Sequence, residues 1–93
     1  MGAKVDNYYV SLHRQVSWQE PSVELRHHHG DRGIDRVVAL SLPQARALRR
    51  AAARGGDDFR TALETFHGAF ARDIGPEGVE VLSLLLLDVS SLL

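Results

Sequence analysis

Hydrophobic and polar residues alternate along the chain from residue 8 to residue 18. One set of alternate positions is apolar and the other is largely polar; the apolar set is Tyr8, Val10, Leu12, Val16 and Trp18. A period of two is typical of a β-strand that buries one face. After a break at residues 19–22, Val23 and Leu25 continue the apolar pattern in a second stretch that reaches residue 28. We therefore expect a hairpin that pairs Trp18 with Val23 and Val16 with Leu25.

A third strand is predicted over residues 34–40, after a turn at residues 29–33 that contains two glycines. Val38 and Leu40 share one face of this strand, whereas Val37 and Ala39 share the other. Apolar side chains on both faces indicate that both are buried, or that one of them meets a partner chain.

A helix is expected to follow this strand. Ser41 and Gln44 fit a capping box, but Pro43 also fits the first helical position with Leu42 as the cap. The restriction on the residue before a proline favours Leu42 as the cap. Helical spacing places Ala45, Leu48 and Ala52 on one side, and Gly55 with Gly56 ends the helix. The opposite side carries four arginines: Arg46, Arg49, Arg50 and Arg54.

A second helix is predicted after Asp57 or Asp58, either of which can cap it. Its apolar stripe consists of Phe59, Ala62, Leu63, Phe66 and Phe70, and we expect all three phenylalanines in the core.

The segment over residues 76–93 fits either a helix or a strand. Its leucine content, its leading proline and its length favour a helix. In a helix, Leu84 and Leu87 lie on the polar side. Together with Val37, Ala39, Leu92 and Leu93, they are candidate interface residues.

These elements predict an α+β fold in which an N-terminal antiparallel three-stranded sheet is followed by two or three packed helices. The 93 residues form a single small domain, residues 1–93. Because so short a chain buries only part of its apolar surface, we expect a homodimer.

Composition narrows the possible chemistry. The chain has no cysteine, which excludes a disulfide, a thiolate metal site and a cysteine nucleophile, and which fits a cytoplasmic location. Residues 84–87 form the longest apolar run and are far too short to span a membrane. The N-terminus lacks the apolar core of a secretory peptide.

No catalytic residue, metal site or cofactor is predicted. The chain lacks a nucleophile elbow, a phosphate-binding loop and a dinucleotide fingerprint. The predicted hairpin places His13 opposite His28 near the histidines at 27–29, but two imidazoles make only half of a zinc site.

Charge is distributed unevenly although the net charge is only −1. Residues 43–56 carry four arginines and no acid, and residues 57–93 carry two arginines against seven acids. The basic helix can attract a polyanion, or it can dock on the acidic part of a second copy.

Residues 36–72 resemble the ribbon-helix-helix family of dimeric DNA-binding regulators and antitoxins. The similar parts are the strand that ends at Ser-Leu-Pro-Gln, the basic helix, the glycine pair and the second amphipathic helix. The resemblance implies a strand that pairs with a second copy and reads bases from the outward positions 37, 39 and 41.

We therefore expect a small non-enzymatic regulatory or protein-interaction module that acts as a homodimer with a protein partner. The alternative is a nucleic-acid-binding transcriptional regulator or antitoxin that uses Arg46, Arg49, Arg50 and Arg54.

Overall fold

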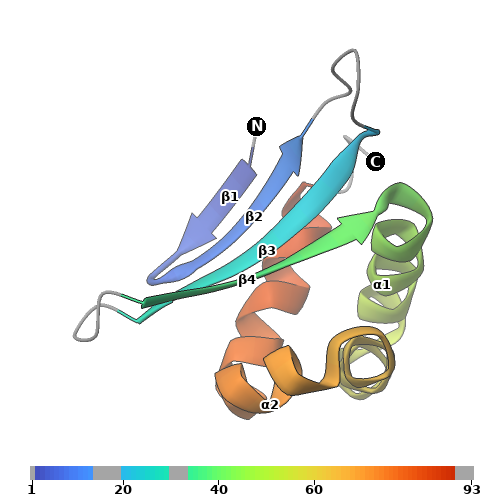
Figure 1. Ribbon diagram of the computed structural model, residues 1–93. Coiled ribbons are helices and arrows are strands. Elements are labelled where there is room, and N and C mark those ends of the chain that lie inside the picture. Colours follow the sequence, from blue (N-terminus) through green and yellow to red (C-terminus); the bar gives the residue numbers. More distant parts are fainter. Residues whose placement is uncertain (1, 14–19, 30–33, 90–93) are drawn as a thin grey trace.

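The chain folds as an antiparallel sheet followed by two helices (Figure 1). The structure is a computed structural model that describes residues 2–13, 20–29 and 34–89. The strands are β1 (Gly2–Val5), β2 (Tyr8–His13), β3 (Ser22–His29) and β4 (Ile34–Ser41), and the helices are α1 (Leu42–Arg54) and α2 (Gly56–Asp88). The expected α+β class is confirmed, but the sheet has four strands in the order β1-β2-β3-β4 rather than three.

The strand missing from the sequence prediction is β1. It pairs with β2 from Gly2↔Ser11 to Val5↔Tyr8, and Asp6 and Asn7 form the two-residue turn between them. Asp6 has φ 51°, in the left-handed region that Asp and Asn tolerate better than most residues. An Asp-Asn pair between two short apolar stretches was the sequence signal for this hairpin.

The pairing of β2 with β3 differs from the predicted register. Val10 lies opposite Leu25 and Leu12 lies opposite Val23, so the predicted partners Val16 and Trp18 are wrong. Residues 14–19 themselves lie outside the described residues. The shift is even, so it leaves the same side chains on the same face, and alternation alone does not distinguish the two registers.

Helix α1 begins directly where β4 ends, through a capping box at Ser41. The Ser41 hydroxyl oxygen accepts a hydrogen bond from the main-chain N–H of Gln44, and the Gln44 side-chain oxygen accepts one from the N–H of Ser41, both at 3.3 Å. The favoured prediction of Leu42 as the cap is therefore wrong, because a leucine cap offers no acceptor to these amides. The predicted buried side of the helix is confirmed at Ala45, Leu48 and Ala52.

Helix α2 is interrupted twice. The backbone is non-helical at His67 (φ −145°, ψ 67°) and at Gly75 (φ 71°), and Pro76 opens the last segment. That last segment is helical to Asp88, which confirms the helix favoured over a strand as far as the structure describes it. Asp57 and Asp58 do not cap the helix; they lie in its first turn and pair with Arg60 and Arg54 at 3.0 Å.

The core lies between the helices and one face of the sheet. Val10, Val23, Leu25 and Leu40 from the strands are fully buried against Leu48, Phe59, Leu63, Leu82 and Leu86 from the helices. Phe66 was predicted in this core but is 36% exposed. The break at His67 turns the helix immediately after Phe66, so residues before and after it no longer share one face.

Alanine variants of Phe59 and Phe66 test which of the two side chains lies in the core. We expect Phe59→Ala to lower the free energy of unfolding by about 3–5 kcal/mol, because it leaves a cavity in the core. We expect Phe66→Ala to lower it by about 1 kcal/mol or less, because its side chain is partly in water. Urea denaturation of the two variants measures both values, and equal losses would place Phe66 back in the core.

Gly78 allows α2 to approach the sheet closely at Tyr8. A Cβ atom on Gly78 would lie 2.9 Å from Cε1 and 3.0 Å from the hydroxyl oxygen of Tyr8. Tyr8 is further held by stacking on His27, with ring centroids 4.4 Å apart. Burial raises the pKa of the Tyr8 hydroxyl, and the carboxylates of Glu77, Asp6 and Asp73 raise it further.

We expect Gly78→Ala to destabilise the protein by about 1–3 kcal/mol, because its Cβ would lie 2.7 Å from the Cβ of Ile74 as well as against the Tyr8 ring, so the helix must shift. Gly68→Ala is the matched control: its Cβ would meet only the flexible guanidinium of Arg72 at 3.2 Å. The control gains helix propensity and should be neutral or up to about 1 kcal/mol more stable. Thermal unfolding distinguishes the two; a neutral Gly78→Ala would contradict the close contact.

Candidate interaction surface on the sheet

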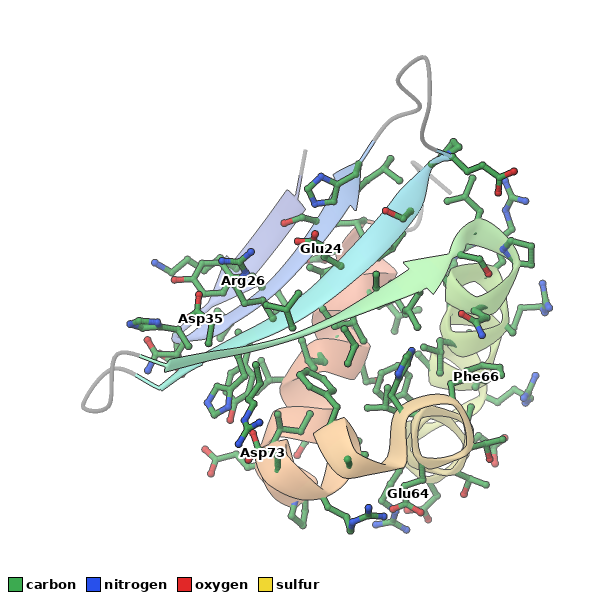
Figure 2. The ribbon with its side chains drawn as sticks, viewed as in Figure 1. Glu24, Arg26, Asp35, Glu64, Phe66 and Asp73 are labelled. Atoms are coloured by element: carbon green, nitrogen blue, oxygen red, sulfur yellow. The ribbon has the colours of Figure 1, made fainter. Side chains whose placement is uncertain are left out.

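The sheet face that points away from the helices is open, and its side chains are mostly polar (Figure 2). The strand registers place the same-facing residues of neighbouring strands side by side, for example Tyr9 beside Arg26 and Arg26 beside Val37. The described members of this face, which we call the open face, are Lys4, Tyr9, Ser11, His13, Glu24, Arg26, His28, Asp35, Val37 and Ala39.

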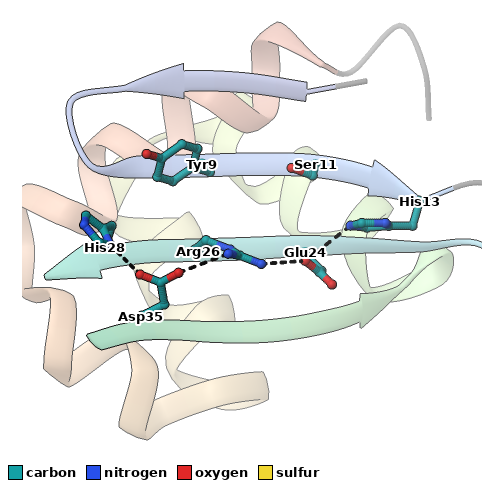
Figure 3. A pocket seen from close by; sticks show the side chains of 7 residues that line it. All are labelled: Tyr9, Ser11, His13, Glu24, Arg26, His28 and Asp35. Atoms are coloured by element: carbon teal, nitrogen blue, oxygen red, sulfur yellow. Dashed lines mark hydrogen bonds and ion pairs between the residues drawn. The ribbon is translucent and has the colours of Figure 1, made fainter. Parts of the chain in front are cut away.

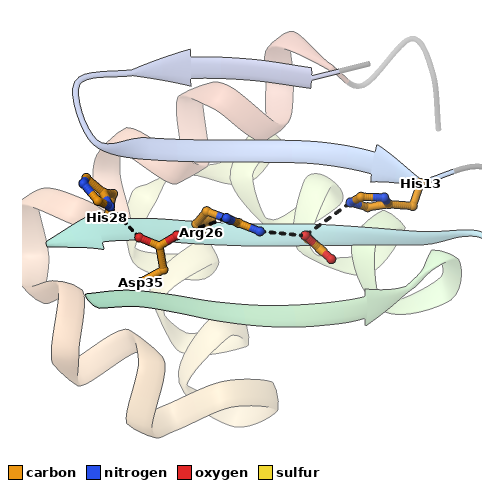
Figure 4. Close-up of polar contacts among 5 residues, drawn as sticks. His13, Arg26, His28 and Asp35 are labelled. Atoms are coloured by element: carbon orange, nitrogen blue, oxygen red, sulfur yellow. Dashed lines mark hydrogen bonds and ion pairs between the residues drawn. The ribbon is translucent and has the colours of Figure 1, made fainter. Parts of the chain in front are cut away.

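Five of these side chains form a continuous chain of polar contacts across three strands (Figure 3). At one end, His13 Nε2 lies 3.2 Å from Glu24 Oε1, which is 3.6 Å from Arg26 Nη2. Arg26 Nη1 donates to Asp35 Oδ2 at 3.0 Å. At the other end, His28 Nδ1 donates to Asp35 Oδ1 at 2.5 Å (Figure 4).

The charged groups of this ionic chain contact one another. The two carboxylates flank a single guanidinium, so opposite charges alternate along the chain. The side chains are partly exposed, so water screens these pairs and each contributes little to stability. Tyr9 and Ser11 complete a shallow depression of about 360 Å³ above the ionic chain, and neither of their hydroxyl groups contacts a member of the ionic chain.

The predicted juxtaposition of His13 and His28 is wrong. His13 lies opposite Ser22, and the main-chain N–H of His28 donates to the carbonyl of Asn7 at 2.8 Å. The two histidines therefore sit at opposite ends of the ionic chain. Within the described residues, no three His, Asp or Glu side chains are grouped closely enough to hold a metal ion.

An apolar strip borders the ionic chain along β4, the outermost strand. Val37 is 42% exposed and Ala39 is also exposed, so neither is buried as one reading of the sequence suggested. Next to this strip, a groove of about 330 Å³ runs between β4 and α2, lined by Val37, Val38, Ala69 and Phe70. Arg36 and Asp73 close the groove, with Arg36 Nε 3.7 Å from Asp73 Oδ2.

The other interface candidates lie elsewhere. Leu84 is 60% exposed and Leu87 is half-buried, and both line a groove of about 380 Å³ among the helices. Leu92 and Leu93 lie outside the described residues. The structure thus does not bring Leu84 and Leu87 together with Val37 and Ala39, because the helices and the open face are on opposite sides of the sheet.

All four arginines of α1 are exposed, as the helical spacing predicted. Arg54 Nε donates to Asp58 Oδ2 at 3.0 Å, which ties it to the first turn of α2. Arg49 and Arg50 form no ion pair with any described residue and extend into solvent.

Comparison with protein-family models, with curated proteins and with solved structures gives no match to this chain. Among the described residues, neither helix has the combination of length and apolar character that crossing a bilayer requires.

The ionic chain lowers the pKa of the Asp35 carboxyl. The hydrogen bond from His28 is the chief cause, and the charge of Arg26 lowers the pKa further. The ionised form is therefore favoured by folding, and its contribution to stability is present above the ordinary pKa of aspartate and lost as the pH falls through the folded pKa. We expect His28→Gln to raise this pKa more than Arg26→Gln does. An NMR titration of the Asp35 carboxyl carbon measures it, and an unshifted pKa in the unmutated protein would contradict the contact.

Proposed function

We propose that this chain is a small non-enzymatic regulatory or protein-interaction module that acts as a homodimer through the edge of β4. The observation that carries the proposal is the character of that edge. Strand β4 is eight residues long and outermost in the sheet, and no described strand pairs with its outer side. Towards its C-terminal end, residues 37–40 are apolar and carry no charge.

The opposite edge of the sheet differs in ways that support this choice. Proteins blunt solvent-exposed edges with short strands and lysines, because an open edge pairs with other chains. Strand β1 has only four residues, and its Lys4 ammonium lies over the Tyr9 ring at 5.3 Å. Strand β4 has neither protection at its centre, which favours a strand that is covered by another chain.

The polar groups of the open face support a binding role over catalysis. The carboxylates, the guanidinium and the imidazoles of the ionic chain are bonded to one another, and no hydroxyl nucleophile is joined to a base. We also retain the cytoplasmic location in the proposal, because a chain without cysteine suits a reducing compartment.

Val37→Lys tests the edge against a matched control. A lysine at the centre of β4 adds a charge where a second chain would pack, and we expect it to shift the protein to a monomer. Val5→Lys is the control, because Val5 is 45% exposed and lies on the opposite edge. Light scattering at micromolar concentration should give a dimer for the unmutated protein and for Val5→Lys.

A monomeric unmutated protein would contradict the homodimer. If circular dichroism shows that both variants are folded and Val37→Lys is still a dimer, the dimer contact lies outside β4.

Nucleic-acid binding is the second candidate, favoured by the exposed Arg49 and Arg50 on an acid-free helix. With four phosphate contacts from each of two subunits, the logarithm of the DNA affinity would fall with the logarithm of the salt concentration with a slope of about −7. The affinity would then fall about 10⁴-fold between 50 and 200 mM salt. We expect only non-specific association that is lost near physiological salt, because Val37 and Ala39 offer no hydrogen bonds to base edges.

The test is a salt titration against random DNA and against the DNA upstream of the protein's own coding sequence. Arg49→Ala/Arg50→Ala is compared with Arg60→Ala/Arg72→Ala, a control pair of exposed arginines on α2. Sequence-selective binding that persists at about 150 mM salt and is lost only in the α1 double variant would establish the nucleic-acid alternative instead.

A further inference from the structure

We infer that two copies of the chain pair β4 against β4 in an antiparallel register with the two-fold axis at Val37, so that residue 35 lies opposite residue 39 and the two sheets join into one of eight strands. This inference rests on the proposed homodimer and specifies its geometry. It follows from the direction of the main-chain groups of β4, from the capping box that ends the strand, and from the charges beside the edge.

One main-chain hydrogen bond fixes the direction of these groups. In an antiparallel pair, opposite residues alternate between those that exchange two hydrogen bonds and those that exchange none. The His28 N–H donates to the carbonyl of Asn7, the residue that continues the β2–β3 register, so His28 belongs to a bonded pair. The even-numbered residues of β3 therefore turn their N–H and C=O groups toward β2, and the odd-numbered ones turn theirs toward β4.

The same alternation carries over to β4. The odd-numbered residues Val23, Leu25 and His27 lie opposite Leu40, Val38 and Arg36, so these three β4 residues bond to β3. The main-chain groups of Asp35, Val37 and Ala39 consequently point out of the sheet edge. Ser41 agrees with this assignment, because its N–H points away from β3 and donates to the Gln44 side chain.

The capping box then selects the register. With Val37 opposite Val37 of the partner copy, residues 35, 37 and 39 of one copy meet residues 39, 37 and 35 of the other, and all three outward N–H and C=O pairs are satisfied. If the partner moves by two residues so that Val37 meets Ala39, Asp35 meets Ser41, whose N–H is already occupied by Gln44. The register centred on Val37 therefore pairs every outward main-chain group of residues 35, 37 and 39, and it uses only described residues of β4.

Side chains beside the edge suit this register. On the open face, the two Val37 side chains meet, and each Ala39 lies opposite Asp35, whose carboxylate is held by His28 and Arg26 of its own copy. On the helix side, the two Arg36 side chains become diagonal neighbours. Asp73 of each copy lies 3.7 Å from its Arg36 and offsets the repulsion between the two guanidinium groups.

The absence of native cysteine allows a direct test by cross-linking. In the inferred register, the two Val37 Cα atoms lie about 5.5 Å apart, within the range of a disulfide. Val37→Cys should form a disulfide-linked dimer on mild oxidation. Ala39→Cys is the matched control. Residue 39 of one copy lies opposite residue 35 of the other, about four residues along the strand from the partner's residue 39, so the two cysteines should not form a disulfide.

Asp73→Asn provides a second readout outside β4. It removes the carboxylate beside each Arg36, and we expect the dimer dissociation constant to rise about 5-fold at low salt. Glu64→Gln, an exposed change on the same helix, should leave the dissociation constant unchanged.

The outcomes separate this inference from the proposed function. Cross-linking of Val37→Cys but not of Ala39→Cys supports the register. A dimer by light scattering in which Ala39→Cys cross-links, or in which neither variant does, overturns the register but keeps the homodimer. A monomer at every micromolar concentration overturns both.

Discussion

The burial of one face of the sheet against the helices determines the rest of the molecule. Val10, Val23, Leu25 and Leu40 are fully removed from water, and each such side chain contributes about 1.5–3 kcal/mol when it is buried. Because side chains alternate along a strand, fixing these residues inward fixes their neighbours outward. The ionic chain and the apolar strip at Val37 and Ala39 lie on the open face for this reason.

The same constraint determines the edge of β4. The pairing with β3 that places Val38 and Leu40 on the helix side also turns the main-chain groups of Val37 and Ala39 out of the sheet. The capping box then ends the strand at Ser41 and starts α1 without a connecting loop. The result is a short run of main-chain donors and acceptors that no described strand pairs with, and apolar side chains lie beside it. These are the features of a strand that another strand extends.

Much of this arrangement could be predicted from the sequence, because it depends on local patterns. Alternation identified the buried and outward sides of β2 and β3, and helical spacing separated Leu48 from the arginines of α1. In β4 both faces are apolar, so the pattern left open which face is buried. The register of β2 against β3 could not be predicted in this way, since an even shift preserves the pattern. The β2–β3 register depends on which part of the N-terminal region pairs with β3. The Asp6-Asn7 turn that brings β1 beside β2 was not recognised from the sequence.

The interruption of α2 at His67 also escaped sequence reasoning, whereas Pro76 marked the start of the last segment. A histidine does not by itself break a helix, so the exposure of Phe66 could not be predicted from the helical spacing. The ionic chain was missed for a related reason. Glu24 and Arg26 share one face of β3 by alternation, but only the strand registers place His13 and Asp35 beside them.

Amide hydrogen exchange along β4 tests the account most directly. The N–H groups of residues 38 and 40 bond to β3 and should be protected at every protein concentration. Those of residues 37 and 39 should exchange rapidly in dilute monomer and become protected as the protein dimerises. Protection of residues 37 and 39 that does not depend on concentration, or rapid exchange at both positions in a protein shown to be dimeric, would contradict the open edge of β4 and its pairing with a second copy.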